Sequence, residues 1–288
     1  MVENKNNLFS KNKYIKGNLK FAVIGHIEWI NFLKVDLLPE PGIITHAKTS
    51  LELPAGGGAL IAKTLYELSN NEIHFFTSLG KDYYGEKSFE FFKNIGINLH
   101  VAWRSEATRK GFSLIDKNGE RSITIIGKRL APSFNDNLDW SILSDMDGIF
   151  VTAGDDNLLK KARKANILCT TPRVGIDLIN KSKVTLDALI GSNLDPGESF
   201  LLSDLHKKPR YIIKTEGEKG GIYIPGGRFN AINNNDLKID SYGCGDSFAA
   251  GILYGLAGNW PIEKALKLGT VLGRNCIEHF GPYPNMKK

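Results

Sequence analysis

The feature that most restricts the fold of this sequence is a series of short, almost wholly apolar runs separated by helix-patterned segments. The first run is Phe21-Ala22-Val23-Ile24-Gly25, and later ones occupy residues 148–152, 167–171, 188–192 and 211–214. Strands that are apolar on both sides are typical of a parallel sheet whose two faces are covered by helices. Apolar residues at helical spacing predict those helices over 59–69, 86–95, 157–165, 247–256 and 262–279.

Two further segments alternate polar and apolar positions instead. Residues 26–54 are interrupted by prolines, and residues 99–126 contain an Asn-Gly turn at Asn118-Gly119. Alternation favours strands with one exposed face, and an Asn-Gly turn favours a hairpin. We therefore expect a small layer of antiparallel strands, drawn from about 26–54 and 99–126, beside the main sheet.

The ends and the composition exclude several classes of protein. The first eighteen residues are rich in Asn and Lys without hydrophobic periodicity, so 1–18 is expected to be a flexible tail and 19–288 a single domain. The longest uncharged apolar stretch, 248–262, is fifteen residues and too short to span a membrane. The N-terminus lacks a secretory signal, so a cytoplasmic protein is expected. Three distant cysteines and six unclustered histidines predict neither disulfides nor a transition-metal site.

The net charge of +6 is spread over the tail, the C-terminus and one helix face. We therefore expect no nucleic-acid partner, although a diffuse positive field would favour an anionic small molecule. Arg104, Arg109 and Arg121 fall on the extra strands. Solvated positions are the default for them, and an anionic substrate is the alternative partner for one of the three.

The segment with the most specific chemistry is Asp240-Ser241-Tyr242-Gly243-Cys244-Gly245-Asp246-Ser247-Phe248. Small residues directly before a helix let backbone N–H groups approach an anion, and the helix N-terminus carries about half a positive charge. A carboxylate such as Asp246 at a helix start is ordinarily a cap. The glycine-rich turn beside it favours a catalytic base.

This segment closely resembles the D-T-x-G-A-G-D-x-F signature of the ribokinase/PfkB family of carbohydrate kinases. The resemblance implies that Asp246 deprotonates an acceptor hydroxyl and that the amides of Gly243, Cys244 and Gly245 form an anion hole for the transferred phosphoryl group. It also implies the family's fold, a three-layer α/β/α sandwich with a mostly parallel central sheet and a small antiparallel β lid.

The likeness extends from residue 21 to about residue 284 through weaker motifs. Ala55-Gly56-Gly57-Gly58-Ala59 resembles the family's sugar-binding glycines, and Gly80–Gly85 resembles its G-x-D-x-x-G loop. Thr215–Gly220 resembles its T-x-G-x-x-G nucleotide loop. The resemblance thus implies substrate contacts at Glu28, Gly56, Gly57 and Gly58, and nucleotide contacts at Asn193, Thr215, Gly217, Gly220 and Asn275.

Three positions depart from the family pattern. Glu28 supplies the only carboxylate shortly after the first strand, and Leu60 replaces an Asn that usually contacts the sugar. The usual N-x-x-E, whose Glu orders magnesium-bound water, reads Asn193-Leu194-Asp195-Pro196. Asp195 is the candidate metal residue, with Glu198 as the alternative.

The resemblance implies an ATP-dependent kinase that phosphorylates a hydroxyl of a small sugar, polyol or nucleoside-like compound. Its cofactors would be ATP and Mg²⁺, with a monovalent cation left open, and a homodimer through the lid is plausible. The alternative is a catalytically impaired, ligand-binding regulator on the same scaffold, which the changes at Leu60 and Asp195-Pro196 would suit.

Overall fold

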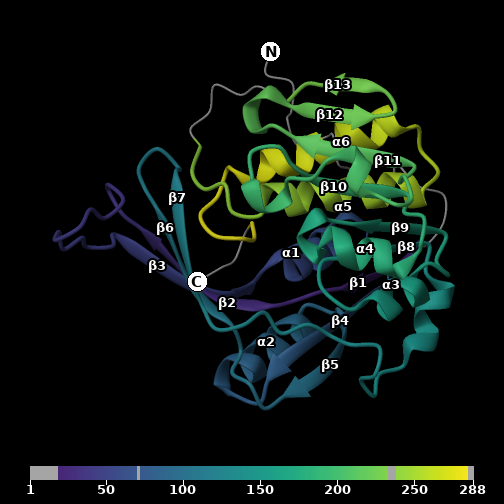
Figure 1. Cartoon of the computed structure of the whole chain (residues 1–288). Coiled ribbons are helices and arrows are strands. Elements are labelled where there is room, and N and C mark those ends of the chain that lie inside the picture. Colours follow the sequence, from purple (N-terminus) through teal and green to yellow (C-terminus); the bar gives the residue numbers. More distant parts are fainter. Residues whose placement is uncertain (1–18, 70–71, 233–237, 285–288) are drawn as a thin grey trace.

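The computed structural model describes residues 19–69, 72–232 and 238–284 (Figure 1). The segment expected to be a tail, 1–18, lies outside the described residues. Within them, no helix has the length and apolar character needed to cross a bilayer.

The described residues contain one large sheet. Its strand order is β13 (Gly227–Phe229), β12 (Gly221–Ile224), β11 (Tyr211–Thr215), β10 (Ala188–Ser192), β9 (Ile167–Thr170), β8 (Gly148–Val151), β1 (Lys20–Ile24), β4 (Glu72–Gly80) and β5 (Asn98–Arg104). The strands from β11 to β5 are parallel, and β12 and β13 form an antiparallel edge. The expected mostly parallel sheet is confirmed.

Helices cover both faces of this sheet (Figure 1). One apolar core joins it to α1 (Gly57–Ser69), α2 (Tyr83–Asn94), α5 (Cys244–Ala257) and α6 (Ile262–Cys276). The other core joins it to α3 (Asp156–Ala162) and α4 (Ile176–Ser182). Short 3₁₀ helices complete the connections: η2 (Trp140–Asp145), η3 (Pro172–Val174), η4 (Pro196–Glu198), η5 (Leu202–Asp204) and η6 (Gly217–Lys219).

A smaller sheet projects from the body (Figure 1) and is called the lid sheet below. Its order is β3 (Thr49–Ala55), β2 (Glu28–Lys34), β6 (Lys110–Ile115) and β7 (Arg121–Ile126). β2 pairs in parallel with β6, and the outer pairs are antiparallel. The lid sheet is anchored to the body because Phe32 packs edge-on against Tyr242 and the Tyr283 hydroxyl donates to the Pro54 carbonyl.

One part of the expected lid lies elsewhere. The sequence predicts lid strands drawn from about 99–126, but Asn98–Arg104 in this range forms β5 and pairs with β4 at the edge of the large sheet. An edge strand covered on one face, here by α2, has the same alternating pattern as a lid strand. Only β6 and β7 from this range belong to the lid sheet.

Helix ends also differ from the sequence prediction. α5 begins at Cys244 rather than at 247, because Gly243 adopts a left-handed conformation and forms the N-cap. Asp246 therefore lies in the first turn of the helix. α2 begins at Tyr83 since Asp82 caps it, and α6 ends at Cys276 rather than at 279.

Candidate functional site

The glycine-rich turn before α5 has a backbone that only glycine can adopt without strain at Gly243. Its φ is +84°, and a Cβ there would lie 2.7 Å from Leu60 Cδ2. Leu60 is therefore buried against the turn rather than directed at a substrate. Asp240 holds the preceding backbone, since its carboxylate accepts hydrogen bonds from the amides of Tyr242 and Gly281.

Several amides of this turn are available to a ligand. Among the described residues, the N–H groups of Gly243, Gly245 and Asp246 have no acceptor, and that of Cys244 reaches the Ser241 carbonyl only at 3.4 Å. Gly245 is exposed, and a Cβ built on it would meet nothing within 4 Å. Free amides at a helix N-terminus favour an anion.

Asp246 is partly exposed and has no hydrogen-bond partner among the described residues. Its Oδ1 lies against Gly57, where a Cβ would come within 2.9 Å of that oxygen. Burial raises the pKa of Asp246 from 3.8 to about 6; the charge of Glu198 adds to this rise, and Arg121 and Arg173 oppose it. The carboxyl group is thus accessible and able to exchange a proton near neutral pH.

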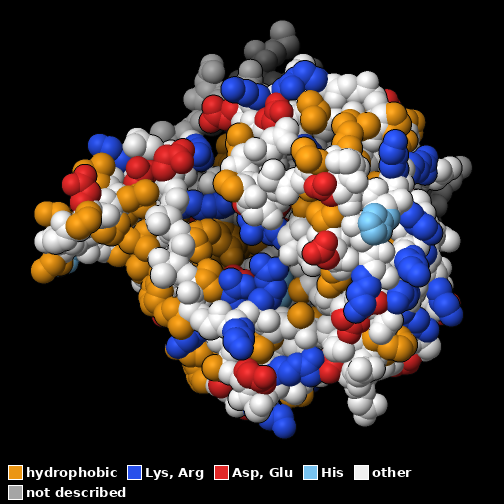
Figure 2. Space-filling model, in the orientation of Figure 1, with side chains coloured by type: hydrophobic (Ala, Val, Ile, Leu, Met, Phe, Trp, Pro, Cys, Tyr) orange, Lys and Arg blue, Asp and Glu red, His pale blue; other side chains and the backbone are white. Residues whose placement is uncertain are grey.

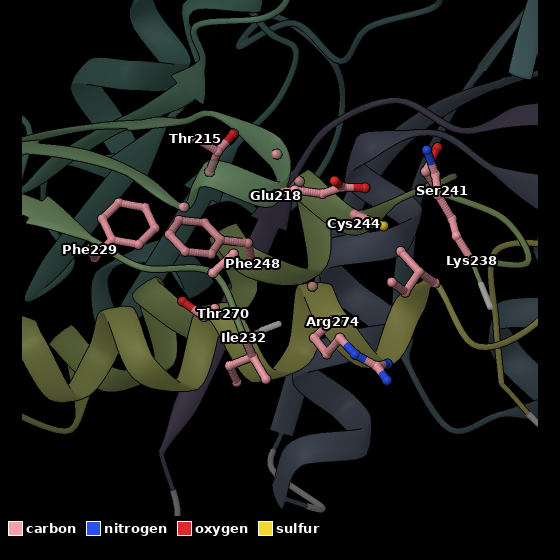
Figure 3. A pocket seen from close by; sticks show the side chains of 16 residues that line it. Thr215, Glu218, Phe229, Ile232, Lys238, Ser241, Cys244, Phe248, Thr270 and Arg274 are labelled. Carbon is pink, nitrogen blue, oxygen red and sulfur yellow. The ribbon is translucent and has the colours of Figure 1, made fainter. Parts of the chain in front are cut away.

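A cavity of about 240 Å³ opens beside the same turn. Figure 3 shows Phe229, Phe248 and Ile232 at one end of it and Cys244 and Ser241 at the other. The Phe229 and Phe248 rings stack with centroids 5.5 Å apart. An apolar slot that ends at free amides suits a ligand with a flat aromatic part and an anionic part.

Three of the five residues expected to contact nucleotide line this cavity, namely Thr215, Gly217 and Gly220. Five residues named from the sequence line it: Thr215, Gly217, Gly220, Cys244 and Gly245. Asn193 and Asn275 are not among its lining residues. Asn193 is exposed and donates to the Glu216 carboxylate, and Asn275 is exposed near the end of α6. The apolar wall was missed because Phe229 and Ile232 read as ordinary hairpin positions.

On the other side of Asp246, the three consecutive glycines have different surroundings. Gly56 has a φ of +93°, and a Cβ on it would lie 3.2 Å from the His26 ring and 3.3 Å from Glu28. Gly57 borders Asp246. Gly58 packs against the backbone of His26, where a Cβ would come within 3.0 Å, so its role is to bring α1 close to β1.

Glu28 begins β2 and is buried next to these glycines. Its Oε1 lies 3.1 Å from Arg109 Nη1 and 3.4 Å from His26 Nε2. Burial raises the pKa of Glu28 although Arg109, Arg129 and Arg173 oppose the rise. Burial and the same arginines hold the pKa of His26 well below its usual value, so this imidazole is neutral at pH 7.

Asp195 and Glu198 both pair with Arg173, but their settings differ. Asp195 caps η4 by accepting from the Gly197 amide, and its side chain is 29% exposed. Glu198 is 11% exposed, accepts from the Ser192 amide at 2.6 Å and is the acidic group that most affects the pKa of Asp246. In the described ranges, no three His, Cys, Asp or Glu side chains converge as ready-made metal ligands.

The loop Gly80–Gly85 positions part of the site without reaching it. Asp82 accepts from the amides of Gly85 and Thr108 and from the Thr108 hydroxyl. It thereby ties the start of α2 to the residue that precedes Arg109. Trp29, in β2 of the lid sheet, donates to Glu52 and packs against Tyr84, so it is a packing residue.

One family model and several known proteins are similar to this chain. A family model described as pfkB family carbohydrate kinase matches residues 18–174 and 176–288. The chain is 24% identical to a ribokinase of Lactococcus lactis, over 93% of this chain and 94% of the relative. It is 25% identical to a nucleoside kinase of Methanocaldococcus jannaschii, over 93% of each chain.

The fold is shared with solved structures. An Arabidopsis thaliana ribokinase, solved in complex with ribose and ATP, superposes with a TM-score of 0.68 at 20% identity, covering 92% of this chain and 94% of that one. An adenosine kinase of Sinorhizobium meliloti superposes with a TM-score of 0.75 at 16% identity, covering 94% and 97%. The expected ribokinase-like α/β/α fold is confirmed.

Proposed function

The chain belongs to the pfkB family of carbohydrate kinases and is an ATP-dependent kinase, and from this premise we propose that it phosphorylates a hydroxyl of a small sugar or nucleoside-like compound with Asp246 as general base. One observation carries the proposal. An accessible carboxylate without a hydrogen-bond partner in the described chain lies beside free helix amides, and Cys244 and Gly245 of the same turn line a cavity with an apolar slot.

Each group has one role in the proposed reaction. Phe229 and Phe248 hold the adenine of ATP, and the amides of Gly243, Cys244 and Gly245 stabilise charge on the moving phosphoryl group. The acceptor lies over Gly56 and Gly57. Its hydroxyl proton passes to Asp246 as the oxygen bonds to the γ-phosphorus, and ADP departs with the electrons of the broken P–O bond. The lid sheet covers the acceptor and excludes water.

The reaction should depend on pH through Asp246. Its pKa is raised to about 6, so the base is protonated and inactive below that pH and ionised above it. We expect kcat/KM, which reports the free enzyme, to fall about tenfold per pH unit below about pH 6 and to be level above it. A rate profile with ATP and acceptor both well below their KM values checks this, and a profile flat down to pH 4 would exclude Asp246 as the base.

We propose Glu198, rather than Asp195, as the protein carboxylate near Mg²⁺. Mg²⁺ commonly uses one or two carboxylates, substrate phosphates and water, which does not need a preformed cluster of protein ligands. Bound Mg²⁺ would offset phosphate charge during transfer. Both carboxylates accept from a backbone amide and pair with Arg173, so these contacts do not separate them. Glu198 supports this assignment because it is the better shielded of the two and acts electrostatically on Asp246.

The matched substitutions Glu198→Gln and Asp195→Asn separate the two candidates. We expect Glu198→Gln to raise the Mg²⁺ concentration for half-maximal rate several-fold. It should also move the acidic limb of the pH profile to lower pH, because the charge of Glu198 raises the pKa of Asp246. Asp195→Asn should shift both quantities less. A larger effect of Asp195→Asn would assign the metal to Asp195 instead.

A homodimer through the lid sheet is also proposed. Phe112 on the outer face of β6 and Ile44 in the β2–β3 connection are 39% and 85% exposed, respectively. A second copy of the chain could cover this apolar surface.

The proposed function is tested by ADP release with ATP, Mg²⁺ and a panel of sugars, polyols and nucleosides. At least one acceptor should stimulate release in the wild type. The alternative, a regulator that only binds ligands, is favoured by Leu60 and Pro196 at positions where the family differs. It predicts saturable binding of a panel compound without stimulated ADP release.

A further inference from the structure

Two arginines act on Glu28: Arg109 lies within ion-pair distance of it, and Arg129 acts on it electrostatically. Neither of them lines the cavity next to the glycine-rich turn. Arg109 precedes β6 and shares with Glu28 the face of the lid sheet that looks onto the body, since β2 and β6 are paired in parallel. Gly127, with a φ of +89°, turns the chain after β7, and its Cβ position is 4.0 Å from the Arg109 Cα. This turn brings Arg129 back into the same region.

Figure 2 shows basic side chains gathered around the hollow between the lid sheet and the body. Arg109, Arg129 and Arg173 all act electrostatically on both His26 and Glu28. They therefore converge on one small volume from three separate parts of the chain.

The three guanidinium groups differ in how they are paired with carboxylates. Arg173 is engaged by Asp195 and Glu198. Arg109 and Arg129 share the single carboxylate of Glu28, and only Arg109 is within ion-pair distance of it. His26 contributes no charge because its pKa is lowered well below neutrality. The Arg129 guanidinium thus has no carboxylate within ion-pair distance among the described residues.

Hydrogen-bond donors are unused at the same place. The Nε atoms of Arg109 and Arg129 are buried without a hydrogen-bond partner in the described structure. Burial and the neighbouring arginines lower the pKa of Arg129, which shows that its charge is unfavourably placed in the unliganded protein. Leaving a buried charge and buried donors unpaired is costly, so the arrangement favours an anionic ligand with several acceptor oxygens.

The position of Arg109 and Arg129 relative to Asp246 indicates which part of a bound acceptor these arginines would contact. Gly57 touches Asp246, and the adjacent Gly56 touches His26 and Glu28. An acceptor over these two glycines would have one hydroxyl at Asp246 and its far end at Glu28 and the arginines. The nucleotide phosphates would instead approach from the cavity side, at Cys244 and Gly245.

We infer that the phosphoryl acceptor is a sugar derivative that already carries an anionic group, a phosphate or a carboxylate, bound by Arg109 and Arg129. This inference rests on the proposed function and names the substrate class of the same site. Arg104 is excluded from the role, since both of its terminal nitrogens bind the Asp136 carboxylate. A neutral sugar would leave both Nε donors and the Arg129 guanidinium without a close partner.

The test compares matched acceptors in the ADP-release assay: ribose with ribose 5-phosphate, fructose with fructose 6-phosphate, and glucose with gluconate. We expect kcat/KM for at least one anionic acceptor to exceed that of its neutral partner by about 100-fold or more. The phosphate and carboxylate pairs distinguish the two sources of the charge. Binding of the same compounds without ATP is measured in parallel by calorimetry.

Arg129→Gln should lower kcat/KM for the anionic acceptor by about 10- to 100-fold, the contribution of one hydrogen bond to a charged group. Its KM for ATP should change far less. Arg129→Lys, which keeps the charge but loses the planar fork, should fall between the wild type and Arg129→Gln. Lys128→Gln, which removes the neighbouring exposed cation, is the control, and thermal unfolding of each variant verifies folding.

The outcomes separate this inference from the proposed function. Turnover of neutral acceptors at rates equal to or above those of their anionic partners would overturn the inference while the kinase function stands. An equal loss of kcat/KM for the anionic acceptor in Arg129→Gln and Lys128→Gln would also overturn the inference. Binding of an anionic sugar that depends on Arg129, without turnover of any acceptor, would support the inference and count against the proposed function.

Discussion

Replacing Asp246 with asparagine is expected to lower kcat by about 10²- to 10⁴-fold, the usual contribution of a general base. The amide cannot accept the acceptor's proton, but it has nearly the same shape as the carboxyl group. Because ATP is proposed to bind at the turn and the apolar slot rather than at this side chain, nucleotide affinity should be almost unchanged. Steady-state turnover and calorimetric titration with ATP measure the two quantities.

Stability supplies an internal control for the same variant. Because burial raises the pKa of Asp246 to about 6, the ionised group destabilises the folded state above that pH, and below its ordinary value of 3.8 it has no such effect. Asp246→Asn should therefore be more stable than the wild type at pH 8, by up to about 3 kcal/mol, and almost equally stable at about pH 3. The exposed Asp177 is the matched site, where Asn should alter neither turnover nor stability appreciably.

A wild-type level of turnover in Asp246→Asn would exclude the base assignment. Loss of turnover together with loss of stability at pH 8 would mean that Asp246 supports the fold instead of the chemistry.

The second large effect is expected for Gly243→Ala. A left-handed conformation costs a residue with a Cβ about 1–2 kcal/mol, and the new methyl group would also press on Leu60. Since Leu60 is buried in the core that joins the lid sheet to the body, the turn and α5 would both have to shift. We expect destabilisation of about 2–4 kcal/mol and loss of nearly all activity, measured by denaturant unfolding and turnover.

Gly245→Ala is the matched variant, because a Cβ at Gly245 meets no protein atom within 4 Å and the residue needs no left-handed conformation. It should fold as stably as the wild type and still lose activity, since the methyl group would occupy space beside the amides proposed to bind phosphoryl oxygens. An active Gly245→Ala enzyme would exclude those amides from the anion hole. A stable Gly243→Ala protein would show that the turn tolerates a side chain.

The fold could be predicted wherever a local sequence pattern is compatible with only one kind of structural element. The apolar runs at β1, β8, β9, β10 and β11 required a sheet covered on both faces, and the glycine-rich turn identified the start of α5 to within three residues. Asn98–Arg104 could not be assigned this way. Alternation reports one exposed face, and both the lid sheet and the edge of the large sheet provide such a face.

The candidate site was predictable only where spacing is local. Asp246 and its turn are contiguous, so the motif alone located them. Glu198 lies at an irregular spacing from Asn193, and only the 3₁₀ turn of η4 shows how its side chain faces the site. No sequence pattern identifies Arg129, which follows β7 in a loop. The role proposed for it depends on the turn at Gly127, where the chain returns toward Arg109.

Phosphorus NMR of the wild type with ATP, Mg²⁺ and the acceptor panel tests the central claim most directly, because it separates transfer from hydrolysis and from simple binding. We predict a new phosphate monoester signal that grows in step with ADP, requires an acceptor and is nearly absent in Asp246→Asn. Saturable ligand binding without any ester, or ATP loss that yields only inorganic phosphate with every acceptor, would contradict it.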